Sequence, residues 1–167
     1  GSTIAKLADD VVYTWAGPEI AVATTKGYTT QVAVMDMLAV YLARRLGRLD
    51  DAQNKELVDA ILQFPSLIQR SIDLNPNLPA LAEKYHSHND VFFIGRNLDY
   101  AASMEGSLKL KEISYLHSEA YAAGELKHGT IALIEKGRPV VALACYETLF
   151  DKMMSNIKEV KARGAQV

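Results

Sequence analysis

The segment "DVFFIGRNLDYAASMEGSLKLKEISYLH", residues 90–117, decides the fold. It begins with a run of β-forming residues that ends at Gly95, which predicts a buried strand. The residues that follow have helical spacing, and a helix is expected from about Asp99 to His117. A strand followed directly by a helix is the repeating unit of an α/β fold.

A second strand–helix pair follows the first. "PVVALAC", residues 139–145, predicts an apolar strand, and residues 147–164 predict an amphipathic helix closed by Gly164. The final "AQV" is expected to begin another strand, whereas residues 118–137 lack periodicity and are expected to be looser. Nearly unbroken apolar strands alternating with helices are typical of parallel strands covered on both faces. The sequence therefore predicts an α/β fold, a doubly wound parallel sheet flanked by helices, whose ligands bind beyond the carboxyl ends of the strands.

The beginning of the chain is expected to contain a short strand and a long helix. The apolar residues Val11 to Trp15 precede a Gly-Pro pair, which predicts the strand. Residues 23–47 predict the helix, with Thr24 or Thr25 as its cap and Gly47 as its end. Hydroxyl and free N–H groups at that helix start are also suited to binding an anion such as phosphate, so both interpretations stay open.

The middle of this helix, Val32 to Leu42, is apolar nearly all round, which predicts that it is buried. A second helical region, residues 49–74, is expected to bend or break at Pro65. Residue 1 is Gly rather than Met, and the sequence stops where a strand is expected to begin. We therefore expect a piece of a larger protein, with its sheet truncated.

The composition is ordinary for a soluble globular protein, with 49% apolar and 23% charged residues. The net charge of −2 offers no basic surplus for binding a nucleic acid or a membrane surface. No apolar run reaches the roughly 20 residues that span a bilayer. The single cysteine, Cys145, permits no internal disulfide or thiolate cluster; we expect an inert core thiol in a reducing, cytoplasmic setting.

Three charged residues share one face of the helix expected after residue 98. Glu105, Lys109 and Glu112 have the spacing i, i+4, i+7. Such a face can be a surface ladder of ion pairs that stabilises the helix slightly. It can also be a proton-handling surface, because a carboxylate near both a lysine and a second carboxylate is in an arrangement that pushes pKa values apart. The small residues of the same helix favour the second interpretation, since they indicate close packing by neighbours.

The four histidines differ in their surroundings. His86 and His88 lie in a polar turn, and no carboxylate or cysteine has the spacing to complete a metal site with them, so no metal is predicted. His117 is expected to end a helix, where a partial positive charge is favourable. His128 follows Lys127 in a glycine-flanked, non-periodic segment, and its imidazole is suited to proton transfer near pH 7. No nucleotide-binding glycine motif is present, and no cofactor is predicted.

Two long motifs resemble one enzyme family. "EGSLKLKEISYLHSEAYAAGELKHGTIALI", residues 105–134, is similar to the signature of the second sugar-isomerase domain in the glutamine–fructose-6-phosphate aminotransferases (isomerizing). "AGPEIAVATTKGYTTQ", residues 16–31, resembles the segment near the end of the first such domain. The resemblance implies that residues 1–47 close the first domain and that residues 48–167 are the second, without its C-terminal end.

In this family a glutaminase domain releases ammonia, and two sugar-isomerase domains use it to convert fructose 6-phosphate to glucosamine 6-phosphate. Val22 and Thr24 match positions that line the sugar site. The family's glutaminase domain, phosphate loop and C-terminal lysine are not in the sequence, so the chain alone is expected to be inactive. Two alternatives stay open: a fructosamine-6-phosphate deglycase-like enzyme of the same fold, and a sugar-phosphate-sensing binding domain.

The resemblance also implies roles for the charged helix face and for one histidine. Glu112 resembles the base that moves a proton between C1 and C2 of the sugar, and Lys109 and Glu105 resemble the residues that assist it. His128 resembles the ring-opening histidine, which in this family reaches the site of the neighbouring subunit in a homodimer. The helix face would then transfer the proton, and the loop would place His128 in the partner's site.

Overall fold

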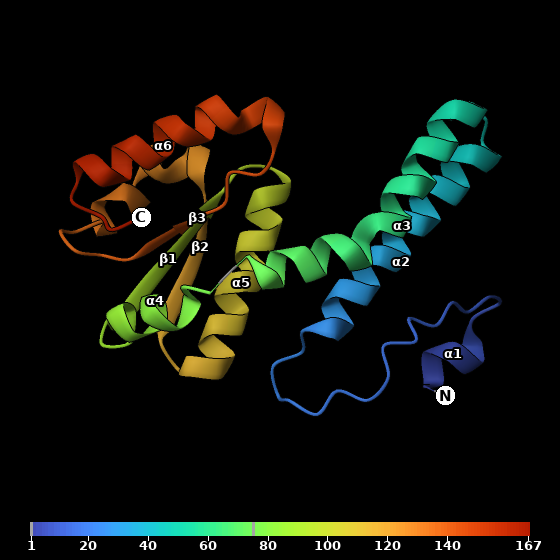
Figure 1. The fold of residues 1–167 in the computed structure, drawn as a ribbon, viewed down its shortest axis with the longest axis horizontal. Helices are drawn as coiled ribbons and strands as arrows, with labels where there is room; N and C mark the ends of the chain where they lie inside the picture. Colours follow the sequence, from blue (N-terminus) through green and yellow to red (C-terminus); the bar gives the residue numbers. More distant parts are fainter. Residues whose placement is uncertain (1, 75) are drawn as a thin grey trace. The chain divides into compact units, whose positions relative to one another are not determined.

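The computed structural model describes residues 2–74 and 76–167, which form two compact units divided after Pro76. The first unit is helical and contains α1 (Thr3–Leu7), α2 (Lys26–Arg45) and α3 (Asp51–Asp73) (Figure 1). The second unit contains α4 (Leu78–Tyr85), β1 (Asp90–Gly95), α5 (Leu98–Ser114), β2 (His117–Ala122), β3 (Val140–Ala142) and α6 (Phe150–Ala162). Short 3₁₀ helices η1 (Ala123–His128), η2 (Thr130–Leu133) and η3 (Glu147–Leu149) lie between β2 and α6.

Local sequence signals form the turn between α2 and α3, which pack against each other. Gly47 adopts a φ of +65°, and its N–H donates to the Arg44 carbonyl at 3.1 Å, so the predicted glycine ends α2. Asp50 then caps α3. Its carboxylate accepts the Gln53 N–H at 2.8 Å, and its own N–H donates to the Gln53 side chain at 3.1 Å.

The start and the middle of α2 differ from the sequence prediction. Thr25 is the last residue before the helix, but no side chain caps the helix start. Val34 is buried, whereas Met35 is 63% and Tyr41 is 59% exposed, so the prediction of a buried helix is wrong. Within its unit α2 packs against α3, and one neighbouring helix covers only one side of an apolar circumference.

α3 contains a proline but is one continuous helix. It runs from Asp51 to Asp73 through Pro65. Figure 1 shows that its axis changes direction along its length. The ring of a proline inside a helix removes one hydrogen bond and clashes with the preceding turn, and a bend relieves that clash. The helix is therefore bent and not broken.

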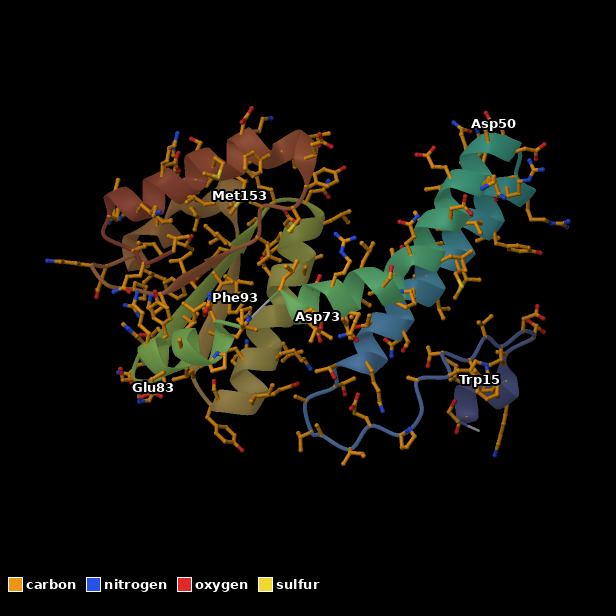
Figure 2. All side chains as sticks on the ribbon, viewed as in Figure 1. Trp15, Asp50, Asp73, Glu83, Phe93 and Met153 are labelled. Atoms are coloured by element: carbon orange, nitrogen blue, oxygen red, sulfur yellow. The ribbon has the colours of Figure 1, made fainter. Side chains whose placement is uncertain are left out.

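The strand predicted at Val11 to Trp15 is absent. These residues have no regular structure, and Trp15 is 90% exposed with a φ of +54° (Figure 2). An extended segment becomes a stable strand when a neighbouring strand satisfies its N–H and C=O groups. No strand of the described residues pairs with this segment, so its β-forming composition is not sufficient.

β1 is the central strand of a three-stranded parallel sheet with the order β2-β1-β3. It pairs with β2 along its whole length, from Asp90 opposite His117 to Gly95 opposite Ala122. Beside β3, Gln166 forms an isolated parallel bridge with Pro139, which agrees with a strand beginning at the end of the chain. The predicted α/β fold with a parallel sheet flanked by helices is confirmed.

The two faces of β1 are buried by different helices. Phe92 and Ile94 lie in the core cluster with Met153 and other residues of α6. Phe93 points to the other face, where a methyl group added at Gly106 of α5 would lie 3.0 Å from its ring. Successive strand residues alternate between faces, so a strand covered on both faces must be apolar throughout. This explains the unbroken run that decides the fold.

The segment around His117 differs from the sequence prediction. α5 ends at Ser114, where Tyr115 adopts a left-handed φ of +61° and donates its N–H to the Lys111 carbonyl at 3.0 Å. The predicted helix is therefore too long, and His117 does not end it but begins β2. Part of the segment expected to be looser, residues 118–137, is this strand and two 3₁₀ helices.

Candidate functional site

The predicted charged face of α5 is present as a connected cluster. The Lys109 ammonium lies 2.6 Å from Glu112 Oε2 and 3.5 Å from Glu105 Oε1. The three side chains are only 18% to 30% exposed. Residues three and four apart on a helix meet on one face, so this arrangement follows directly from the spacing in the sequence.

The electrostatics of the cluster favour a charged lysine. The hydrogen bond to Glu112 raises the pKa of Lys109 above its ordinary value, and the negative charges of Glu112 and Glu105 raise it further against a partial desolvation. Lys109 therefore stays protonated through the physiological range. A carboxylate beside a fixed ammonium can accept a proton while the ammonium stabilises negative charge that develops on a bound oxygen.

The opposite face of α5 packs on the sheet through small polar residues. Ser107 accepts a hydrogen bond from the Ser118 hydroxyl of β2 at 2.9 Å, and Ser103 donates to the Asp99 carbonyl at 2.7 Å. Both serines are fully buried. Since each residue advances about 100° around a helix, Glu105 and Glu112 point away from this face. The packing of α5 thus directs the charged cluster away from the sheet.

His128 lies at the end of η1, beside an open groove of about 590 Å³. Tyr100, Tyr121 and Glu125 also line this groove, which lies at the carboxyl end of β2. The imidazole is 75% exposed, with Nε2 3.8 Å from Glu125 Oε2. Among the described residues, no hydrogen bond or ion pair joins His128 to the charged cluster of α5.

Asp99 is a buried acid at the same edge of the sheet that the sequence prediction missed. It is 8% exposed, and its Oδ2 accepts the N–H groups of Cys145 at 2.9 Å and Tyr146 at 3.1 Å. The carboxylate thereby holds the segment after β3 against the start of α5. Asp99 shares the i, i+4, i+8 stripe of Ser103 and Ser107, and an acid on a stripe of small residues is the signal that could have found it.

The remaining predicted residues are placed as follows. Val22, 95% exposed, and Thr24 lie in irregular structure just before α2, in the first unit. His86 Nδ1 lies 2.7 Å from the Glu83 carbonyl oxygen, and the ring of His88 lies against Tyr85. Within the described residues, no His, Cys, Asp and Glu side chains gather in a group of three that could hold a metal ion.

Cys145 differs from its prediction. β3 ends at Ala142, so Cys145 follows the strand and its residue is exposed at the edge of the sheet. The prediction of a core thiol is wrong because the apolar run continues beyond the part that pairs with β1. None of the described helices combines the length and the apolar character of a membrane span.

Comparison with known proteins places this geometry in a family. The model of the SIS domain matches residues 84–167. A protein of Clostridium tetani named glutamine–fructose-6-phosphate aminotransferase [isomerizing] is 56% identical over 99% of the chain. The chain belongs to the SIS domain family. A Thermococcus kodakarensis protein with the same name is 48% identical over the whole chain.

The SIS fold is also found in a solved structure with a related sequence. The C-terminal domain of glucosamine-fructose-6-phosphate aminotransferase from Francisella tularensis superposes with a TM-score of 0.96 at 38% identity. That comparison covers 99% of this chain and 47% of the solved one. The chain spans 27% and 28% of the lengths of the two curated relatives. It therefore corresponds to the SIS part of much longer proteins.

Proposed function

We propose that the chain is the isomerase region of a cytoplasmic, dimeric glutamine–fructose-6-phosphate aminotransferase. The observation that carries this proposal is the carboxylate–ammonium–carboxylate cluster of Glu105, Lys109 and Glu112 on α5. A protein that only senses a sugar phosphate needs no base, whereas an aldose–ketose shift does. The names of the relatives identified above support the same reaction.

In the proposed reaction, ammonia replaces the keto oxygen of fructose 6-phosphate, which leaves as water, and a proton then moves from C1 to C2. Glu112 takes the proton from one carbon and returns it to the next, which requires a carboxylate that is ionised at the start. Lys109 offers its positive charge to the enediol-like intermediate, and Glu105 holds the lysine from its other side. The product is glucosamine 6-phosphate.

We assign ring opening to His128, acting in the site of the neighbouring subunit of a homodimer. Two observations support this role in trans: the imidazole is 75% exposed, and among the described residues no hydrogen bond or ion pair joins it to the cluster of its own chain. Within the same proposal, residues 1–47 close a first SIS domain, and residues 48–167 belong to a second. Val22 and Thr24 would line the sugar site.

Replacing the base tests this proposal. In the full-length parent protein, Glu112→Gln is expected to lower glucosamine 6-phosphate formation by roughly 10²–10⁴-fold, because the amide cannot accept the proton. Glutamine hydrolysis by the same variant should stay near the wild-type rate. Glu83→Gln, at an exposed glutamate on α4, is the matched control. Near-normal sugar conversion by Glu112→Gln would show that Glu112 is not the base.

A further inference from the structure

A chain of polar contacts ties η1 to α6 and to the end of β1. Lys127 Nζ lies 2.9 Å from Glu159 Oε1, and Asn156 Nδ2 donates to Glu159 Oε2 at 3.2 Å. On its other side, Asn156 Oδ1 accepts the Nε–H of Arg96 at 2.9 Å. Lys127 directly precedes His128, so the chain of contacts ends one residue from the imidazole.

Arg96 also lies directly against η1. A methyl group added at Gly124 of η1 would lie 3.1 to 3.3 Å from the Arg96 guanidinium, so the arginine stands directly against the η1 backbone. Asn156 is 5% exposed, and Leu126, between the two ends of η1, is fully buried. A buried amide that satisfies partners on two elements fixes them relative to each other.

The Glu159 carboxylate pairs with the Lys127 ammonium. The hydrogen bond from Lys127 lowers the pKa of Glu159 below its ordinary value, and bonds from Asn156 and Ser155 act in the same direction against a partial desolvation. The Glu159 carboxylate is 22% exposed, so water screens its pairing with Lys127 only in part. Lys127 thus has a fixed partner, although its own side chain is 64% exposed.

We propose that Arg96, Asn156, Glu159 and Lys127 are positioning residues that hold η1 so that His128 is presented in one place. The inference rests on the ring-opening role that the proposed function gives to His128. In the described structure, no hydrogen bond or ion pair joins any of the four residues to the charged cluster of α5. A loop residue that must act in a partner's site needs a rigidly held backbone, because a displacement of about 1 Å can cost roughly 10²-fold in rate.

Variants of Lys127 in the full-length parent protein test the proposal. Lys127→Met is expected to lower kcat for sugar conversion roughly tenfold with little change in KM, because His128 is displaced while the sugar site is intact. Lys127→Arg keeps the charge and should restore most of the rate. Lys55→Met is the matched control, since it removes the exposed Lys55–Asp59 ion pair of α3.

A double variant separates positioning from a general structural defect. If Lys127 acts through His128, adding Lys127→Met to His128→Ala should change kcat by less than about twofold. If Lys127→Met still lowers kcat roughly tenfold in the His128→Ala variant, the inference is wrong. It is also wrong if Lys127→Met alone has a normal rate while His128→Ala alone is strongly impaired. Full activity of His128→Ala alone would instead remove the role proposed for the histidine, and the inference with it.

Discussion

Lys109 holds both carboxylates of the α5 cluster, and its removal leaves Glu105 and Glu112 facing each other without a cation. In the full-length parent, Lys109→Met is expected to slow glucosamine 6-phosphate formation by roughly 10²-fold, because the intermediate loses its electrostatic partner. Initial rates measure the effect. Lys111→Met is the control, since Lys111 is an exposed lysine on the same helix. Equal rates for the two variants would contradict the proposed role of Lys109.

Glu159 gives a prediction about pH. Its pKa is held below the ordinary value of 4.5, chiefly by the hydrogen bond from Lys127. A lowered folded-state pKa means that the ion pair contributes stability above the unfolded value and loses it as the pH falls through the folded value. Lys127→Met removes the hydrogen bond that lowers this pKa. The variant should therefore raise the pKa of Glu159, as measured by NMR titration of its carboxyl group. An unchanged titration would show that another group sets that pKa.

At the scale of single residues, the sequence predicts contacts that are local and misses those that are distant. The contacts of Glu105, Lys109 and Glu112 follow from helical spacing alone, because all three lie on one helix. Asp99 binds amide groups 46 and 47 residues further along the chain. No periodicity encodes such a pairing, so the buried acid became visible only in the folded structure.

At the scale of elements, pairing decides what composition leaves open. The segment from His117 to Ala122 has no β-branched residue, yet it is a strand because it pairs with β1 along its whole length. The segment from Val11 to Trp15 has the better composition and is irregular, because no described strand lies beside it. Apolar strands covered on both faces, such as β1, are the ones that sequence identifies well.

The tight connection between β1 and α5 gives a prediction for stability. A methyl group added at Gly95 would lie 2.4 Å from the Asp99 backbone, which cannot move without shifting α5. Gly95→Ala is therefore expected to destabilise the chain by about 1–3 kcal/mol, measured by chemical denaturation followed by circular dichroism. Gly27→Ala is the control, because its methyl meets only a rotatable side-chain methyl of Thr24, at 2.7 Å. Comparable losses in both variants would contradict the steric argument.

At the scale of the whole molecule, the proposed dimer can be tested by mixing two inactive full-length variants. His128→Ala and Glu112→Gln should form mixed dimers in which one site has both defects and the other has neither. Random mixing makes about half of all dimers mixed, so roughly a quarter of the wild-type activity should return. Co-expression ensures that mixed dimers form. No recovery in dimers shown to be mixed would place His128 in its own chain's site, or outside catalysis.

The central position of β1 has a consequence for how the chain is made. A ribosome releases β1, α5 and β2 first, and they can assemble as one crossover, but the other edge of β1 stays unpaired until β3 emerges. Residues 96–139 separate the two strands, and at ~5–20 residues per second their synthesis takes several seconds. Throughout it, β1, five of whose six residues are buried in the folded structure, offers an open hydrogen-bonding edge to which a neighbouring nascent chain can pair.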